Sequence, residues 1–460
     1  MNQKYFKLIL ILLSAGVLMT SCGGINRTYQ RPDLKTDGLY RDINTADSTG
    51  IGSLPWKTVF NDPDLQNLIQ EGLSKNIDLL VAIERVKEAE ATLTQSNSAL
   101  YPSLNAGVNA VITHSKASSK APQPGYSDIT LSSSWEIDLW GKLRSNKRAA
   151  VAALLESEAY KKFVQTELIS SIANSYYSLL ALDKQLAITQ KTVENRIADV
   201  KTMKELKESA VTTGAAVVQS EASRYAAEVT IPDLEKNIRE TENALCVLLG
   251  RNPGTIKRST LDEQKQPDTL QTGVPALLLS NRPDVMESEY ALRYAFEKTN
   301  VARAYFYPSV TISAIGGLSN TSIDKIFSGA LFGNLIGGLT QPIFNQGVNK
   351  ARLKITQAQQ EEALLNYKKA LLNAGQEVSN ALYSYQTALN KGEVRNKQIE
   401  SLNKAVEYTM DLLKYGRANY TEVLTAEQNL LYAQLSSVSD KLQQLQTTVS
   451  LYRSLGGGWK

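Results

Sequence analysis

The feature that most constrains the fold of this chain is an internal repeat that covers nearly all of it. Tyr101-Pro102-Ser103 recurs as Tyr307-Pro308-Ser309, an offset of 206 residues between Pro102 and Pro308. A single register over such a distance indicates a tandem duplication, in which each half carries the same order of structural elements. The same offset aligns Asn76-Ile77-Asp78-Leu79 with Arg282-Pro283-Asp284-Val285, Val217-Val218 with Val423-Leu424, Glu221 with Glu427, and Leu249-Gly250 with Leu455-Gly456.

Each half begins with a helical pattern and continues with two stretches of alternating apolar and polar residues. The helical pattern ends at the Tyr-Pro pair, because a residue before proline disfavours the helical conformation. Strands are predicted over about residues 102–115, 127–140, 308–320 and 330–344. Each has about the 9 to 11 residues that a membrane-spanning strand needs. Alternation alone also fits a soluble sheet with one solvated face.

Four strands are too few for a membrane sheet made by one chain. A sheet in lipid leaves no edge unpaired, and the smallest barrels have about eight strands. If the strands lie in a membrane, several chains must therefore each contribute four. Two, three or four copies fit this condition equally well.

A very long helical stretch without proline follows each strand pair. The two stretches run from Gly141 to about Ser209 and from Gln346 to about Tyr415. At about 1.5 Å per residue, each helix would extend roughly 100 Å. Their apolar positions form modest seams that need neighbours on both sides. A returning helix is predicted in each half, over about 217–249 and 421–455.

The amino terminus is typical of an exported lipoprotein. Lys4 and Lys7 precede an apolar run, Leu8 to Met19, which is shorter than the about 20 residues that cross a bilayer. Met19-Thr20-Ser21-Cys22-Gly23 resembles the lipobox that lipoprotein signal peptidase recognises. Cys22 is therefore predicted to become the acylated first residue, and a plain signal peptide with an incidental cysteine is the alternative.

The remaining composition argues against an enzyme and against a nucleic-acid binder. The formal charge is +4, with 50 Lys+Arg and 46 Asp+Glu spread along the 460 residues. The single histidine, His114, has no Cys or acidic neighbours at metal-ligand spacing. No phosphate loop or nucleophile elbow occurs. We expect no catalytic residue, metal or cofactor, and a buried, unpaired thiol at Cys246.

The order and spacing of these segments resemble the outer-membrane factors of tripartite efflux systems, the TolC superfamily, and in particular its lipidated NodT-type branch. The resemblance covers nearly all of residues 22–456. The matching segments are Cys22, Tyr29-Gln30-Arg31-Pro32, Trp56, Phe60, Asp62, Asn76, Asp78-Leu79, Tyr101-Pro102-Ser103, Trp135 to Gly141, Arg282 to Val285, Tyr307-Pro308-Ser309, Gln341-Pro342-Ile343-Phe344 and Tyr415-Gly416.

This resemblance implies a mainly helical, duplicated chain whose four strands complete a trimeric twelve-stranded barrel above a helical periplasmic barrel. It implies a passive exit duct in the outer membrane, with a periplasmic adaptor and an inner-membrane pump, commonly of the resistance-nodulation-division class. A type I protein secretion outlet is the alternative. The predicted division is a signal peptide (1–21), a lipidated segment (22–61), a first repeat (62–250), a linker (251–275), a second repeat (276–456) and a tail (457–460). The exported compounds stay open.

The resemblance also places a periplasmic gate at the turn between the long and returning helices of the second half. Relatives commonly carry two acids there, one helical turn apart, which form carboxylate rings around the trimer axis. Glu422 and Thr425 occupy these positions, so that one ionisable ring remains. By resemblance, Arg417, Tyr415 and Tyr420 would hold neighbouring helices together.

A local explanation of the same residues is also available. Asn419 and Glu422 have the spacing of a capping box, in which the side chains of N-cap and N3 bind each other's backbone amides. The first half aligns Ala216 and Gln219 with Glu422 and Thr425, so the two halves are not equivalent here. Capping and gating are compatible.

Overall fold

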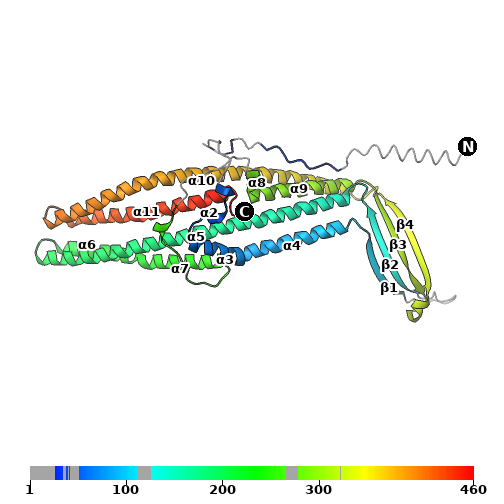
Figure 1. Ribbon diagram of the computed structural model, residues 1–460, viewed down its shortest axis with the longest axis horizontal. Coiled ribbons are helices and arrows are strands. Elements are labelled where there is room, and N and C mark those ends of the chain that lie inside the picture. Colours follow the sequence, from blue (N-terminus) through cyan, green and yellow to red (C-terminus); the bar gives the residue numbers. More distant parts are fainter. Residues whose placement is uncertain are drawn as a thin grey trace. The chain divides into compact units, whose positions relative to one another are not determined.

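The computed structural model describes residues 26–34, 38–39, 41, 51–111, 126–265, 278–321 and 323–459. The chain forms two compact units, each assembled from three distant segments of sequence (Figure 1). The first unit comprises the described parts of 1–34, 85–158 and 287–368, and the second comprises those of 35–84, 159–286 and 369–460. Each unit thus draws on both halves of the duplicated sequence.

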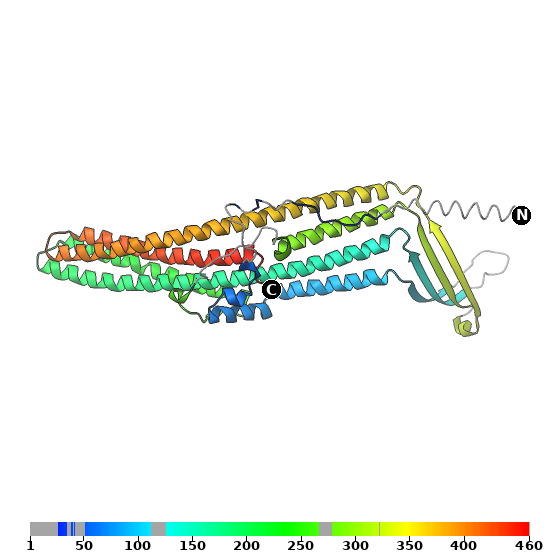
Figure 2. The same cartoon turned by 45° about the horizontal axis from the view of Figure 1, so that its top comes forward.

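The first unit contains an antiparallel sheet of four strands in the order β1-β2-β3-β4 (Figure 2). The strands are β1 (Ser103–Val111), β2 (Tyr126–Ile137), β3 (Ser309–Asn320) and β4 (Ala330–Thr340), with a short 3-10 segment, η4 (Ile323–Ser328), between the last two. All four predicted strands are present. The fourth ends before Ile343, which we had placed in the strand; Pro342 precedes it and has no amide hydrogen for a ladder bond. His114 lies outside the described residues.

The strand register gathers the apolar side chains on one face of the sheet. Ala106 lies opposite Leu131, Val108 opposite Ile129, and Trp135 opposite Ile312. The pairing continues from Ile312 to Gly337 and from Ala314 to Leu335. Asn105 and Thr311 belong to the other, mainly polar face. In the single chain, the apolar face is open, with Leu104, Val108 and Leu131 each more than half exposed.

The two long helices are α5 (Lys142–Glu208) and α10 (Val348–Lys414), each of 67 residues, as predicted. Local chemistry fixes where α5 begins. Gly141 adopts φ +72°, and the Asp138 carboxylate accepts hydrogen bonds from the Leu143 and Arg144 amides at 3.0 and 2.9 Å. No helix in the described ranges is both long and apolar enough to cross a lipid bilayer.

Shorter helices complete both units. They are α2 (Trp56–Val59), α3 (Pro63–Lys75), α4 (Ile77–Ser98), α6 (Gly214–Glu228), α7 (Thr230–Leu248), α8 (Leu278–Asn281), α9 (Pro283–Ala304) and α11 (Tyr420–Ser454), with 3-10 turns η1 (Ile51–Ser53) and η2 (Leu261–Glu263).

One prediction was wrong. The first returning helix is not continuous but divides at Val229 into α6 and α7, because Pro232 lacks an amide hydrogen and its ring crowds the preceding turn. The second returning helix, α11, has no proline and is continuous.

Equivalent contacts tie each returning helix to the start of its own half. The Asn76 side-chain amide donates to the Leu248 carbonyl at 2.9 Å, and Arg282 donates to the Ser454 carbonyl at 3.0 Å. Glycines close both junctions with positive φ, Gly250 at +64° and Gly456 at +79°. A Cβ atom at either position would clash with the backbone of Lys75 or Asn281. The residues that form the two junctions are related by the repeat offset of 206 residues.

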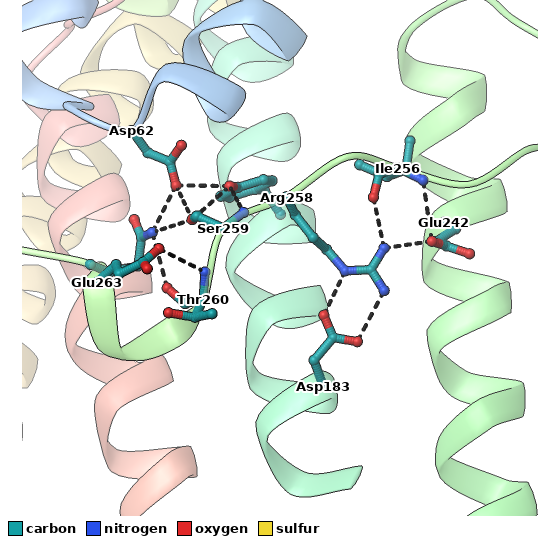
Figure 3. A network of polar contacts seen from close by, with 10 residues as sticks. Asp62, Asp183, Glu242, Ile256, Arg258, Ser259, Thr260 and Glu263 are labelled. Carbon is teal, nitrogen blue, oxygen red and sulfur yellow. Dashed lines mark hydrogen bonds and ion pairs between the residues drawn. The ribbon is translucent and has the colours of Figure 1, made fainter. Parts of the chain in front are cut away.

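Within the second unit, a buried polar network attaches the segment after α7 to α3, α5 and α7 (Figure 3). The Asp62 carboxylate caps α3 by accepting from the Asp64 amide at 2.8 Å, and it also accepts from Tyr176, Ser259 and Gln264. Burial raises the pKa of Asp62, but the hydrogen bonds from Ser259, Tyr176 and Gln264 outweigh this effect and lower it. The network is structural, since the carboxylate oxygens already accept hydrogen bonds from these four donors.

Arg258 forms the second part of this network. Its guanidinium donates to Asp183 on α5 at 2.6 and 3.0 Å and to Glu242 on α7 at 2.5 Å (Figure 3). Nearby, Cys246 is buried and unpaired, as predicted. One arginine therefore joins two helices of the first half to the segment that follows them.

Candidate functional site

The predicted gate lies where four helix ends meet at one end of the second unit (Figure 1). The turn between α5 and α6 and the turn between α10 and α11 are built alike. Amide to carbonyl bonds from Val211 to Leu206 and from Arg417 to Leu412, both 2.9 Å, close the ends of the long helices. Such Schellman-type endings place one residue in the left-handed region, here Ala210 at φ +55° and Gly416 at φ +66°.

The capping box predicted for α11 is confirmed. The Glu422 amide donates to Asn419 Oδ1 at 3.2 Å, and the Asn419 amide donates to Glu422 Oε1 at 3.4 Å. Thr213 occupies the equivalent position before α6 but caps with a single longer contact to the Ala216 amide, 3.4 Å. The second turn is thus held more firmly than the first.

The five predicted gate residues fall into two groups. Tyr415, Arg417, Glu422 and Thr425 are exposed in the single chain. Thr425 donates its hydroxyl to the Thr421 carbonyl at 2.8 Å. Glu422 and Thr425 lie three residues apart on α11 and therefore on one face of that helix. In the part of the chain that the structure describes, no side chain of these four forms a hydrogen bond or an ion pair with another of the four.

Tyr420 is different, because it is buried and packs within its own chain. It forms a core with Met203, Val217, Leu413 and Val423, which join the ends of α5, α6, α10 and α11. Its hydroxyl faces Ser220, and burial raises the pKa of Tyr420. Tyr420 therefore joins helices of the same chain, which the sequence could not specify.

A group of charged residues that sequence reasoning missed lies next to this core. Arg196 and Asp199 on α5 are 6% and 7% exposed, and the Asp199 carboxyl faces Glu427 on α11. The repeat alignment had singled out Glu427 only as the counterpart of Glu221. Its partner comes from the other half of the sequence, so no local pattern could have revealed the pair.

The other predicted site residue, Cys22, lies outside the described residues. Over the described ranges, no group of three or more His, Cys, Asp or Glu side chains is placed to hold a metal ion.

The family model for outer membrane efflux proteins matches residues 68–251 and 274–457, most of the chain. The chain belongs to the outer membrane efflux protein family. This is a transport family, and its members with known structures carry the TolC-like fold of sheet and long helices described above. The protein is accordingly an outer-membrane efflux channel protein with a large helical periplasmic part.

Several relatives match over almost their entire length. The chain is 29% identical to a probable outer membrane lipoprotein, SilC, from Salmonella typhimurium, covering 99% of both chains. It is 28% identical to the cation efflux system protein CusC from Escherichia coli, covering 98% of this chain and 99% of the relative. The solved outer-membrane channel OprN superimposes with a TM-score of 0.87 at 26% identity, covering 94% of this chain and 99% of that channel.

Proposed function

We propose that this protein is the passive outer-membrane exit duct of a tripartite efflux pump, and that three copies form the duct. The observation that carries the proposal is the four-stranded sheet, which has an apolar face and two edges, β1 and β4, that have no partner strand among the described residues. A sheet in lipid must pair both edges. Pairing β4 of one copy with β1 of the next satisfies this condition, and three copies give the twelve strands expected from the family.

The partners follow from the same family membership. A passive duct needs an energised inner-membrane pump and an adaptor that bridges the periplasm, and we propose a pump of the resistance-nodulation-division class. The named relatives are efflux proteins, which supports efflux over type I protein secretion. Because CusC is named as a cation efflux protein and TtgC from Pseudomonas putida as a toluene efflux pump protein, small molecules and metal ions are both candidate cargo.

Two measurements test this assignment. Purified full-length protein should migrate as a heat-resistant trimer and conduct ions in planar bilayers, whereas a lipidated surface scaffold would do neither. Cross-linking in cells should then capture an adaptor and a pump. Capture of an ATP-driven protein exporter instead would favour the secretion alternative.

We further propose that three copies of Glu422 form a narrow acidic ring at the periplasmic end. Like charges near a threefold axis repel one another, and a cation between them lowers that cost. The ring should therefore make the resting channel cation-selective. Arg417 and Tyr415, both exposed in one chain, are proposed to contact neighbouring copies, and Thr425 marks the position of a second ring that carries no charge.

Glu422→Gln separates the charge from the cap, because glutamine also serves at the N3 position of a capping box. We expect this variant to lose cation selectivity and block by multivalent cations in planar bilayers. Asn419→Ala is the matched control: it removes the cap, costs about 1 kcal/mol of helix stability and keeps the charge. Unchanged selectivity in Glu422→Gln would mean that the charge of Glu422 has no role at the opening and that the residue only caps α11.

A further inference from the structure

The group of charged residues behind the turns has an unbalanced charge. Asp199 and Glu427 contribute two carboxyl groups, and Arg196 contributes the one cation that acts on both of them. Two polar atoms of this region, Arg196 Nε and Asp199 Oδ2, are buried and have no hydrogen-bond partner in the described part of the chain. With both carboxyls ionised, this buried region carries one uncompensated negative charge, which is costly away from water.

One proton removes that charge. Burial and the adjacent Asp199 carboxylate together raise the pKa of Glu427 to about 7, and Arg196 opposes the shift. Burial also raises the pKa of Asp199. A carboxylic acid on Glu427 that donates to the Asp199 carboxylate would leave one negative charge, which Arg196 balances. This is the behaviour of two carboxyl groups that share one proton.

We propose that Asp199 and Glu427 bind one proton between them and form a proton-operated latch that holds α11 against α5 behind the periplasmic turns. The position of the pair supports this role. Met203, one helical turn beyond Asp199, belongs to the core that contains Tyr420 and Val423 at the start of α11. Movement of α11 away from α5 would therefore separate the carboxyls and disturb the helix that carries Glu422. This proposal rests on the proposed duct function, because the latch would regulate the opening of the duct.

Among the described residues, Arg196 is the cation that acts on the pKa of Glu427. On α5, Arg196 and Asp199 face it. On α6, Ser220 lies near Tyr420, and Glu221 is already paired with Lys204 of α5 at 2.8 Å. From α10, Val406 lines the adjacent groove.

That groove gives solvent a route to the carboxyl pair. It has a volume of about 340 Å³ and lies beside α5 and α11, with Arg196 and Glu427 among its lining residues and Lys184 and Lys191 farther along α5. Protons can therefore exchange with water without unfolding of the unit.

The duplicated sequence supplies a matched control within the same chain. Glu221 occupies in the first half the position of Glu427 in the second, and it is neutralised by Lys204. The counterpart of Lys204 is Met410, which packs against the apolar core instead. The pair of helices α10 and α11 thus has the acid Glu427 but no lysine at the position equivalent to Lys204. Glu427 faces Asp199 instead.

The direction of the pH effect follows from the raised pKa. Between the ordinary pKa of a glutamate and a pH of about 7, the packed helices hold a proton that separated helices release. Packing is therefore strongest at acidic pH and weakens as the pH rises toward 7 and through it. We expect the resting duct to open more readily at alkaline pH.

The test uses the full-length trimer in planar bilayers between about pH 5.5 and about pH 8.5. The resting conductance of the wild-type protein should rise several-fold across this range with a midpoint near neutrality. Glu427→Gln, which keeps the shape and a hydrogen-bond donor, should stay low and show little pH dependence. Glu221→Gln should titrate like the wild type. An unaltered titration in Glu427→Gln, or the same loss in Glu221→Gln, overturns the latch.

Thermal unfolding of the purified trimer over the same pH range gives a readout that needs no conduction. The melting temperature of the wild type should fall with rising pH more than that of Glu427→Gln. If this difference is absent, the carboxyls do not share a proton and the latch is wrong. If it is present but conductance does not follow it, the pair is structural and the latch is also wrong. A trimer that never conducts would contradict the duct itself.

Discussion

The two periplasmic turns differ at one residue whose conformation is unfavourable for any side chain with a Cβ. Gly416 and Ala210 occupy equivalent positions and both adopt positive φ, +66° and +55°. A Cβ at Gly416 would meet no atom within 4 Å, so steric space does not decide the choice of residue. Backbone conformation alone favours glycine there. The first half therefore keeps a strained residue where the second half has relieved the strain.

Reciprocal substitutions measure that strain. Ala210→Gly should stabilise the first turn and Gly416→Ala should destabilise the second, each by about 1 kcal/mol, because a left-handed residue with a Cβ costs about 1 to 2 kcal/mol and glycine's greater freedom in the unfolded chain offsets part of this gain. Shifts of opposite sign in the melting temperature of the trimer are expected. Shifts of the same sign would show that contacts between copies, rather than φ, control these turns.

At the scale of elements, the register of the sheet gives each strand residue a definite face. Leu104, Val108, Leu131 and Ile312 all belong to the apolar face, whereas Asn105 and Thr311 belong to the other. A one-residue slip would exchange the two sets. Substitutions on each face can therefore test which face of the sheet contacts lipid.

A charge on the apolar face should hinder assembly far more than a charge on the polar face. Val108→Arg or Leu131→Arg should cost about 2 to 4 kcal/mol if the side chain meets lipid near the middle of the membrane. Asn105→Arg and Thr311→Arg are the matched controls on the same strands or their neighbour. The yield of heat-resistant trimer in outer-membrane fractions reports the difference, and equal yields would mean that the apolar face does not contact lipid.

For the whole molecule, attachment to the membrane is predicted to involve a lipid on Cys22 as well as the sheet. The described part of the N-terminal segment, residues 26–34, already contacts the first unit: Arg31 forms an ion pair with Glu289, and Tyr29 packs edge-on against Phe296 at 5.6 Å between ring centroids. Residues 26–34 are therefore docked on α9.

Cys22→Ser should give a chain without lipid that is processed poorly or at another site, because lipoprotein signal peptidase requires the acylated cysteine. Mass spectrometry of the mature amino terminus distinguishes the two forms. Fractionation of the membranes should show less protein in the outer membrane. A native protein that is cleaved at Cys22 but carries no lipid would disprove the lipoprotein assignment.

The sequence by itself determined the features that depend on near neighbours along the chain. Alternating residues predicted the four strands, and proline-free stretches predicted α5 and α10, because a residue's face and its backbone hydrogen bond depend on positions two to four away. The capping box of α11 was predicted for the same reason. The apolar periodicity continues across Pro232 and therefore predicts one helix, although the missing amide hydrogen of Pro232 divides it at Val229.

Only the tertiary structure decided which distant residues meet. Tyr420 was predicted to hold neighbouring helices, and the fold shows that these include α5 and α6 of its own chain. Asp199 and Glu427 lie in opposite halves, and each looks like an ordinary helical acid in its local sequence. Their shared environment, and with it the raised pKa of Glu427, arises from the packing of α5 against α11. The burial and the protonation of these carboxyls depend on that packing. The periodicity of one helix does not specify which other helix will pack against it.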